Sequence, residues 1–332
     1  MTADETNSAG AEQRLSRDAQ HRFGPGAVGL SLLTAALWGG TAVGSRFALD
    51  ALPPITVGAV RFVLAALFML VWCRWERSPL TLKPHQWLPS ITCGVLLFLQ
   101  IAAFNAGQAR TTSSHASLFI NTYIFWVAAY EHFITHQFRM NWRQLGGLVV
   151  AAAGVVILVS SSAAPAKPGS GLDTPTVTGD AIMLLSGLLL GVKVIQTKHA
   201  VRTVPPGTLI LWHDIVGVLL FAAFSAAFET IEPSRISMET VWALLFIGLV
   251  VSGFCFAGQA WLLQRYSAAI VSVFSFATPV FGVSLGVLLR GDGLSPWLLT
   301  SAACVALGIA LVTVKREVRG QTTEARRRSS DP

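Results

Sequence analysis

The chain has 332 residues, of which 53% are hydrophobic and only 12% are charged, whereas soluble domains carry about 25% charged residues. The net charge is +7, but the basic residues stand in short clusters between apolar segments. This distribution excludes a nucleic-acid-binding face. The composition predicts a polytopic membrane protein.

Ten segments are long and apolar enough to cross a membrane as helices, since a spanning helix needs about 20 mostly apolar residues. In chain order they cover residues 27–47, 55–73, 87–105, 113–132, 143–161, 179–197, 208–228, 240–263, 268–289 and 295–314. Pro54, Pro206 and Pro296 stand at or beside helix starts, where proline is tolerated. We therefore predict an all-α polytopic membrane protein with ten transmembrane helices.

The chain contains an internal repeat. Residues 32–54 align with residues 184–206 at an offset of 152, and residues 110–126 align with residues 265–281 at an offset of 155. Each half then holds five helices, an odd number, so the second half must enter the membrane from the opposite side. The sequence predicts two inverted five-helix repeats, an arrangement that places a binding site where the halves meet.

Lysine and arginine residues in the connections predict the orientation, because cytoplasmic connections carry an excess of both. With the N-terminus inside, the cytoplasmic segments hold 17 of these residues and the outer segments hold five. Both termini are therefore expected in the cytoplasm, and the protein in the cytoplasmic membrane.

The predicted organisation has five parts. The connection rich in Pro, Ser, Gly and Thr is typical of a flexible linker, and it joins the two repeats on the outer side. The parts are a polar cytoplasmic tail over 1–26, the first repeat over 27–160, the outer linker over 161–178, the second repeat over 179–314 and a basic cytoplasmic tail over 315–332.

Several motifs resemble a known family. They are ALWGGTAVGSRFAL and LPPITVGAVRFVLAALFML within residues 36–70, ASLFINTY at 116–123, RQLGGLVVAAAGVVIL at 143–158 and ATPVF at 277–281. In these the chain resembles the drug/metabolite transporter (DMT) superfamily, specifically the EamA-type ten-helix permeases, over about residues 27–314.

The resemblance implies a fold in which helices one to four and six to nine enclose a central cavity, with helices five and ten at the periphery. It also implies a secondary transporter, not an enzyme, whose partners are the lipid bilayer and a small-molecule substrate. We expect export of an amino-acid-like or amphipathic compound by alternating access around the cavity.

Four ionisable residues lie inside predicted spans, where a charge costs about 2.5–3.5 kcal/mol and therefore indicates a functional site. Lys193 is expected at the same depth as His213 and Asp214. These side chains form either a static ion pair that fixes helix packing or part of a cavity that holds a zwitterionic substrate. If transport is proton-coupled, Asp214 with His213 is the candidate proton carrier. Arg61 either attracts a substrate carboxylate or extends toward lipid head groups.

Uncharged polar residues inside the spans serve either as interhelical hydrogen-bonding groups or as cavity lining. Among them we select Thr41, Asn121, Tyr123 and Gln259 as candidates for the cavity. Trp38 is the aromatic residue selected, since it lies deep in its span beside two glycines, where the backbone can bend.

Small residues recur in helices five and ten, including Gly154 and Gly308. Such runs favour close helix packing or a contact in a homodimer.

No nucleotide-binding, catalytic or metal-ligand motif occurs in the sequence, so no cofactor and no metal are expected. The four cysteines lie in apolar segments without CxxC spacing, which is typical of buried thiols. One alternative function is an integral-membrane enzyme acting on a lipid-linked substrate, with Glu131, His132 and His136 as its nearest approach to a catalytic cluster. Another is a membrane receptor or scaffold that does not transport.

Overall fold

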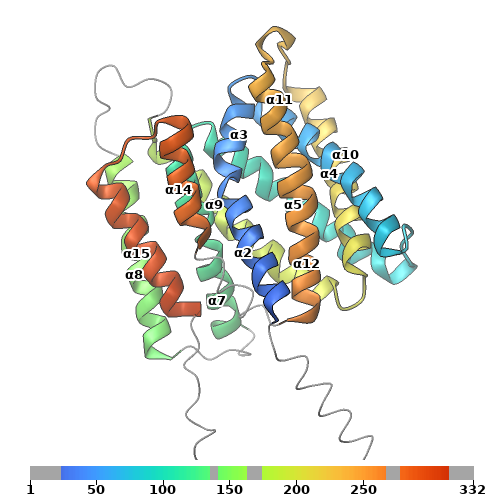
Figure 1. The fold of residues 1–332 in the computed structure, drawn as a ribbon, viewed down its shortest axis with the longest axis horizontal. Coiled ribbons are helices and arrows are strands. Elements are labelled where there is room, and N and C mark those ends of the chain that lie inside the picture. The colour runs from blue at the N-terminus through green and yellow to red at the C-terminus, as the bar shows by residue number, and fades with distance from the viewer. Residues whose placement is uncertain (1–23, 135–140, 163–173, 267–276, 314–332) are drawn as a thin grey trace, which may run out of the picture.

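The computed structural model describes residues 24–134, 141–162, 174–266 and 277–313. Within these ranges every regular element is a helix (Figure 1). The elements are α2 (Pro25–Gly39), α3 (Thr41–Leu49), α4 (Pro54–Glu76), η1 (Pro84–Gln86), α5 (Trp87–Gln108), α6 (Ser113–Ile120), α7 (Tyr123–Phe133), α8 (Trp142–Ser162), α9 (Val177–Ala200), α10 (Pro206–Phe228), η2 (Pro233–Arg235), α11 (Met238–Leu245), η3 (Phe246–Cys255), α12 (Phe256–Arg265), α14 (Ala277–Arg290) and α15 (Pro296–Thr313).

Seven helical segments of the described chain are long and apolar enough to cross a membrane, which makes this a multi-pass membrane protein. They are Pro25–Leu49, Pro54–Glu76, Pro84–Gln108, Trp142–Ser160, Val177–Ala200, Pro206–Phe228 and Met238–Arg265. Two shorter apolar helices, Thr278–Arg290 and Pro296–Gly308, follow near the C-terminus. Ten complete crossings stay a prediction, because much of the predicted ninth span, most of the linker and both tails lie outside the described residues.

Three spans that we predicted as continuous α-helices are interrupted. The first divides into α2 and α3 at Gly40, and the predicted helix over 113–132 divides into α6 and α7. At the second break, Asn121 Nδ2 donates to Ser117 O at 2.7 Å and Thr122 Oγ1 donates to Phe119 O at 2.7 Å. Side chains of this kind compete for carbonyls that a regular helix would use, which explains the interruption.

The predicted helix over 240–263 is the third correction. It begins as α11, continues as the π-helix η3 and ends as α12. The π-helical turns pack against α4, since a Cβ on Gly248 would lie 2.7 Å from Leu64 Cβ and one on Gly253 would lie 2.7 Å from Phe68 Cγ. The π-helix η3 therefore lies where its backbone closely approaches that of α4.

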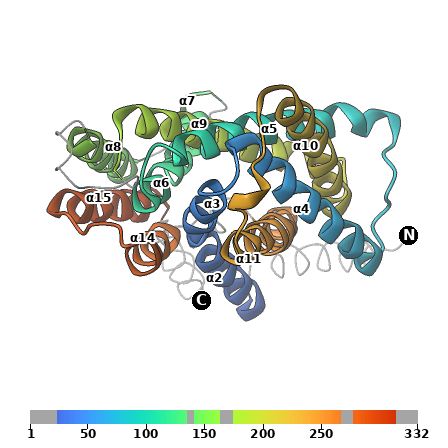
Figure 2. The same ribbon diagram turned by 90° about the horizontal axis from the view of Figure 1, so that it is seen from above.

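Seen along the helices, the molecule consists of two rows (Figure 2). One row holds α8, α7, α9, α5 and α10, and the other holds α15, α14, α2 with α3, α11 and α4. Extensive contacts join α8 to α15, α5 to α9 and α10 to α4. Each row takes helices from both halves of the chain, so the space between the rows is bounded by both halves.

The starts of the long helices follow the predicted pattern. Pro54, Pro206 and Pro296 each begin a helix, as expected for a residue with no N–H to leave unpaired. The start of α4 is also held by Glu229 beyond the end of α10, whose carboxylate accepts from the backbone N–H of Ile55 at 2.8 Å. An acidic group at a helix N-terminus satisfies free N–H groups and complements the helix dipole.

Close glycine contacts in one half recur at equivalent positions in the other. A Cβ on Gly39 would lie 2.5 Å from Phe281 Cβ. A Cβ on Gly191, 152 residues further on, would lie 3.1 Å from Trp126 Cβ, 155 residues before Phe281. Both glycines therefore let a helix of one row approach its neighbour with only a methylene between the backbones.

A second set of close glycine contacts also recurs in both halves, between other helices. A Cβ on Gly94 would lie 2.5 Å from Val216 Cβ, and one on Gly248 would lie 2.7 Å from Leu64 Cβ. The two glycines are 154 residues apart and their partners are 152 residues apart. The contact of α5 with α10 is thus matched by that of η3 with α4.

The small residues of α8 and α15 pack against each other at one end of both rows (Figures 1 and 2). A Cβ on Gly154 would lie 3.1 Å from Ser301 O, and one on Gly308 would lie 2.7 Å from Gly147 O. Ser301 Oγ also donates to Gly154 O at 2.8 Å. This contact accounts for the small-residue runs within one chain, and a homodimer contact stays a prediction.

Candidate functional site

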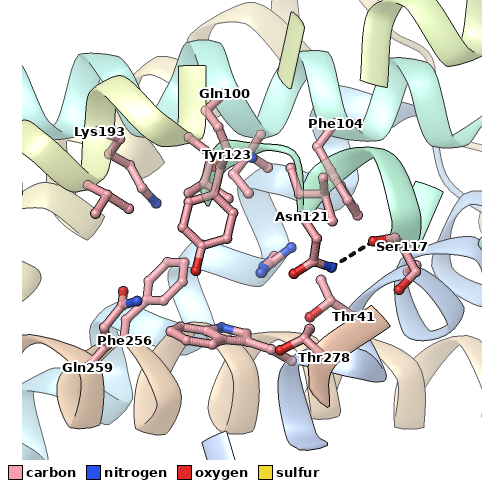
Figure 3. A pocket seen from close by; sticks show the side chains of 17 residues that line it. Thr41, Gln100, Phe104, Ser117, Asn121, Tyr123, Lys193, Phe256, Gln259 and Thr278 are labelled. Carbon is pink, nitrogen blue, oxygen red and sulfur yellow. Dashed lines mark hydrogen bonds between the residues drawn. The ribbon is translucent and has the colours of Figure 1, made fainter. Parts of the chain in front are cut away.

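A cavity lies between the two rows of helices and is lined by both halves of the chain (Figure 3). It contains about 740 Å³ of space not filled by protein atoms, its open side included. Its walls are Trp38, Thr41, Ala42, Arg61, Gln100, Ile101, Phe104, Ser117, Ile120, Asn121, Tyr123, Leu190, Lys193, Val194, Phe256, Gln259 and Thr278. These residues come from α2, α3, α4, α5, α6, α7, α9, α12 and α14 and from the break between α6 and α7.

The structure brings together seven of the nine residues selected from the sequence. The seven in the cavity wall are Trp38, Thr41, Arg61, Asn121, Tyr123, Lys193 and Gln259. His213 and Asp214 do not line this cavity, although both are buried nearby on α10.

Lys193 provides a positive charge on the α9 side of the cavity. Its side chain is 5% exposed, and its Nζ lies 4.3 Å from the centre of the Phe256 ring. Within the described residues no carboxylate lies within 4.0 Å of this ammonium, so the ion pair with Asp214 considered above does not form in this structure. A cation over an aromatic face is stabilised, but it keeps its capacity to donate hydrogen bonds.

Arg61 provides a second positive charge, from α4. Its side chain is 1% exposed, and its Nε donates to Ser252 Oγ at 2.5 Å. Its NH1 is buried with no hydrogen-bond partner in the part of the chain described. The residue therefore does not extend toward lipid head groups. It presents a guanidinium, which suits a carboxylate in bidentate geometry, to the cavity.

His213 and Asp214 form a buried pair behind the cavity wall. His213 Nδ1 lies 2.9 Å from Asp214 Oδ1, yet neither oxygen of this carboxylate has a well-aligned hydrogen bond among the described residues. The His213 ring contacts Phe256, with centroids 5.9 Å apart. Asp214 is close enough to Lys193 and Arg61 to interact with both electrostatically. The pair thus shares a charge environment with the cavity without contacting its space.

Neutral polar groups and aromatic rings complete the wall. In Figure 3, Tyr123 and Lys193 lie on one side of the cavity, with Phe256 and Gln259 opposite. Trp38 extends the aromatic surface, its ring 6.2 Å from that of Phe256. The wall therefore offers a broad apolar surface together with amide and hydroxyl groups, as expected for a pocket that orients an amphipathic small molecule.

Sequence reasoning left three important wall residues unselected. Phe256 holds the Lys193 ammonium but is one apolar residue in an apolar span; the only local signal is its position three residues before Gln259, on the same helical face. Gln100, which donates to Ser186 Oγ at 3.1 Å, and Thr278 resembled ordinary interhelical hydrogen-bonding residues.

Of the residues that the structure describes, no group of three or more His, Cys, Asp or Glu side chains could hold a metal ion. His132 lies at the end of α7 beside Phe133. The side chain of Glu131 and all of His136 lie outside the description, so the structure says nothing about the histidine cluster of the enzyme alternative.

Comparison with known proteins gives the family. A model of the EamA-like transporter family matches residues 26–160 and again residues 177–314. A Bacillus subtilis (strain 168) protein, named "Uncharacterized transporter YoaV", is 23% identical over 278 residues, which cover 83% of this chain and 93% of the relative.

Two further relatives carry more specific names. A Salmonella typhimurium protein named "Probable amino-acid metabolite efflux pump" is 26% identical, over 84% of this chain and 92% of its own length. A Chlamydia trachomatis serovar L2 protein named "S-adenosylmethionine/S-adenosylhomocysteine transporter" is 25% identical, over 86% of this chain and 88% of its own length. A solved crystal structure also matches with a TM-score of 0.65 and 19% identity, covering 91% of this chain and 98% of the other, which concerns the fold alone.

Proposed function

The chain belongs to the EamA-like transporter family, and from this we propose that it is a secondary transporter that exports a small metabolite through the cavity between its two rows of helices. The family and the relatives are named as transporters, so the protein is a membrane transporter and not an enzyme. The substrate, the direction and the mechanism are the parts that we propose.

The observation that carries the proposal is the charge of the cavity wall. Among the wall residues described, the charged ones are Arg61 and Lys193, and both are cations. Burying a charge without a partner is costly, and neither cation has a carboxylate within 4.0 Å in the described chain. A carboxylate on the substrate would supply the missing partner.

The remaining surface restricts the rest of the substrate. Trp38 and Phe256 form an apolar side, while Asn121, Gln259 and Tyr123 add amide and hydroxyl groups. We therefore propose an amino-acid-like or amphipathic carboxylate, with its apolar part against the rings. Export is the proposed direction, in keeping with a relative named as an efflux pump.

Alternating access between inverted repeats is the proposed mechanism, with both termini in the cytoplasm. The close contact at Gly39 has a counterpart at Gly191, and the one at Gly94 has a counterpart at Gly248, which supports this mechanism. These contacts indicate that the two halves use equivalent helix contacts on either side of the cavity. An exchange of conformations between two such halves would open the cavity first to one side of the membrane and then to the other.

Asp214 with His213 is the proposed site of proton coupling. A coupling group must change charge inside the membrane, and this carboxylate is fully buried with no aligned hydrogen bond. The groups that interact with it electrostatically include His213, Lys193 and Arg61. Protonation of Asp214 would change the charge balance around the cavity and hence the affinity of the cavity for an anionic substrate.

The test is uptake by the purified protein in liposomes, with labelled amino acids, other amphipathic carboxylates and matched amines that lack the carboxylate, in the presence and absence of a pH gradient. We expect saturable flux of a carboxylate and none of its amine analogue. Lys193→Ala should raise the substrate concentration for half-maximal flux, whereas Lys198→Ala, five residues further along α9 and outside the cavity wall, should leave it unchanged. Equal transport of the amine would overturn the assignment of substrate class.

A further inference from the structure

A second groove opens on the outside of the helix rows, away from the cavity. It is formed by α2, α4, η3 and α12 and contains about 780 Å³ of space not filled by protein atoms, its open side included. Its walls are Leu30, Trp72, Trp75, Glu76, Phe254, Gly258, Trp261 and Arg265. None of these residues lines the transport cavity described above.

The groove extends from the apolar part of two spans to their ends. Glu76 is the last residue of the span Pro54–Glu76, and Arg265 is the last residue of the span Met238–Arg265. Trp72, Trp75 and Trp261 lie within one turn of these ends, where tryptophan commonly marks the membrane interface. Leu30, Phe254 and Gly258 line the rest. One end of the groove is thus at head-group level and the other reaches toward the hydrocarbon.

The acidic group in the groove is held in a fixed position. Glu76 Oε2 accepts hydrogen bonds from Trp72 Nε1 at 3.2 Å and from Ser78 Oγ at 3.0 Å. Trp72 is fixed in turn by Trp75, with ring centroids 5.3 Å apart, and by Phe68, with centroids 6.0 Å apart. The carboxylate therefore faces the groove beside aromatic surfaces, a setting that suits an ammonium group.

The basic group on the other side is also oriented. The Arg265 guanidinium stacks on the Trp261 ring at 4.0 Å from its centre. Its hydrogen bonds go to Trp261 O at 3.5 Å and to Gln264 Oε1 at 3.4 Å, both on its own helix. Over the described chain, no ion pair within 4.0 Å joins this guanidinium to Glu76. Two opposite charges thus line one groove without neutralising each other.

We propose that this groove binds phosphatidylethanolamine, with the lipid ammonium at Glu76, the phosphate at Arg265 and one acyl chain along Leu30 and Phe254. A zwitterionic head group places its two charges between the two charged side chains. Arginine suits a phosphate because its guanidinium donates in a fixed fork.

The same chemistry discriminates against other head groups. A phosphatidylglycerol head group would pair with Arg265 but leave Glu76 without a cation. A phosphatidylcholine head group can stack on the tryptophans, but its quaternary ammonium has no N–H to donate to Glu76. The groove should therefore prefer the primary amine over both.

Native mass spectrometry of the purified full chain tests this preference directly, after incubation with an equimolar mixture of the three lipids. We expect phosphatidylethanolamine to be retained at least about tenfold over phosphatidylglycerol, the effect of one charge-assisted hydrogen bond. Glu76→Gln should abolish that preference, and Arg265→Gln should lower the retention of all three lipids, since each carries a phosphate. Arg74→Gln, an exposed arginine on α4 outside the groove, should behave like the wild type.

Equal retention of the three lipids by the wild type would overturn the proposal, as would an unchanged preference in Glu76→Gln. Melting temperatures of all variants identify any that fail to fold. If Arg265→Gln is one of these, the preference lost in Glu76→Gln still decides the result. Since no flux is measured, the outcome is independent of the proposed transport function.

Discussion

The two halves of this chain meet at the α8–α15 contact and around the central cavity. Equivalent positions of the halves carry similar residues in the contact but different residues around the cavity. In the contact, equivalent positions carry similar small residues, with Gly154 and Gly308 each close to a carbonyl of the facing helix. Around the cavity, Thr41 is equivalent to Lys193, 152 residues later, and Arg61 is equivalent in the same way to His213, which lies behind the wall. The side chains are alike where the halves only pack and differ around the cavity that is proposed to hold the substrate.

This difference distinguishes what the fold requires from what the substrate requires. Packing of two related helices needs the same close approach from each, which only small residues allow. A substrate that is not symmetric needs different groups on the two sides of the cavity. Residues that break the equivalence are therefore the first candidates for substrate recognition, and those that preserve it are candidates for stability.

The largest effect is expected from Arg61→Gln. Removal of one partner from a buried charge pair costs about 2–5 kcal/mol, so the substrate concentration for half-maximal flux should rise by at least about 30-fold. Liposome uptake measures this change. The melting temperature shows whether the fold survives the loss of the bond to Ser252. An unchanged half-maximal concentration in a folded variant would remove Arg61 from the site.

A smaller effect is expected when the cation is moved across the cavity. Lys193→Thr gives both equivalent positions a threonine and should weaken substrate binding by about 1.5–3 kcal/mol, the value of a charge-assisted hydrogen bond. Adding Thr41→Lys places the ammonium at the equivalent position in the other half and should restore part of the flux. A double variant no better than Lys193→Thr would mean that the two positions are not interchangeable around the substrate.

Asp214→Asn should act on coupling rather than on binding. If one proton moves per substrate, a gradient of one pH unit supports about tenfold accumulation, or about 1.4 kcal/mol. The variant should lose this accumulation but still exchange labelled for unlabelled substrate. Asp50→Asn, which changes a carboxylate outside the cavity wall, is the matched control. Accumulation that persists in Asp214→Asn would exclude this residue as the proton carrier.

The parts of the fold that could be predicted are those with a local physical cause. Proline at a helix start leaves no N–H unpaired, so the starts at Pro54, Pro206 and Pro296 follow from the sequence. The break between α6 and α7 depends on hydrogen bonds of Asn121 and Thr122 to their own helix. The same residue types also occur in uninterrupted helices, so the break could not be predicted.

The candidate site, too, could be predicted from the sequence only in part. Buried charges are rare in spans, so Arg61 and Lys193 could be selected by type alone. The exclusion of Asp214 from the cavity wall depends on Phe256, which lies between the cavity and the His213 ring. Phe256 begins α12, which packs against α10. Selection by residue type therefore finds the charges but not which of them reach the substrate.

The smallest expected effect is on stability, and it has opposite signs at two glycines of α8. Glycine to alanine in a helix is favourable by about 1 kcal/mol where space allows, and nothing lies within 4 Å of a Cβ added at Gly146. At Gly154 the added Cβ would lie 2.8 Å from Cys304 Cβ, so α15 must move, at a cost of about 1–3 kcal/mol. Gly146→Ala should therefore raise the melting temperature slightly and Gly154→Ala should lower it. Because α8 and α15 do not line the cavity, both variants should transport with unchanged half-maximal concentration. Impaired substrate binding in Gly154→Ala alone would show that the packing contact and the cavity are coupled. Residues for stability and residues for substrate recognition could then not be separated as proposed here.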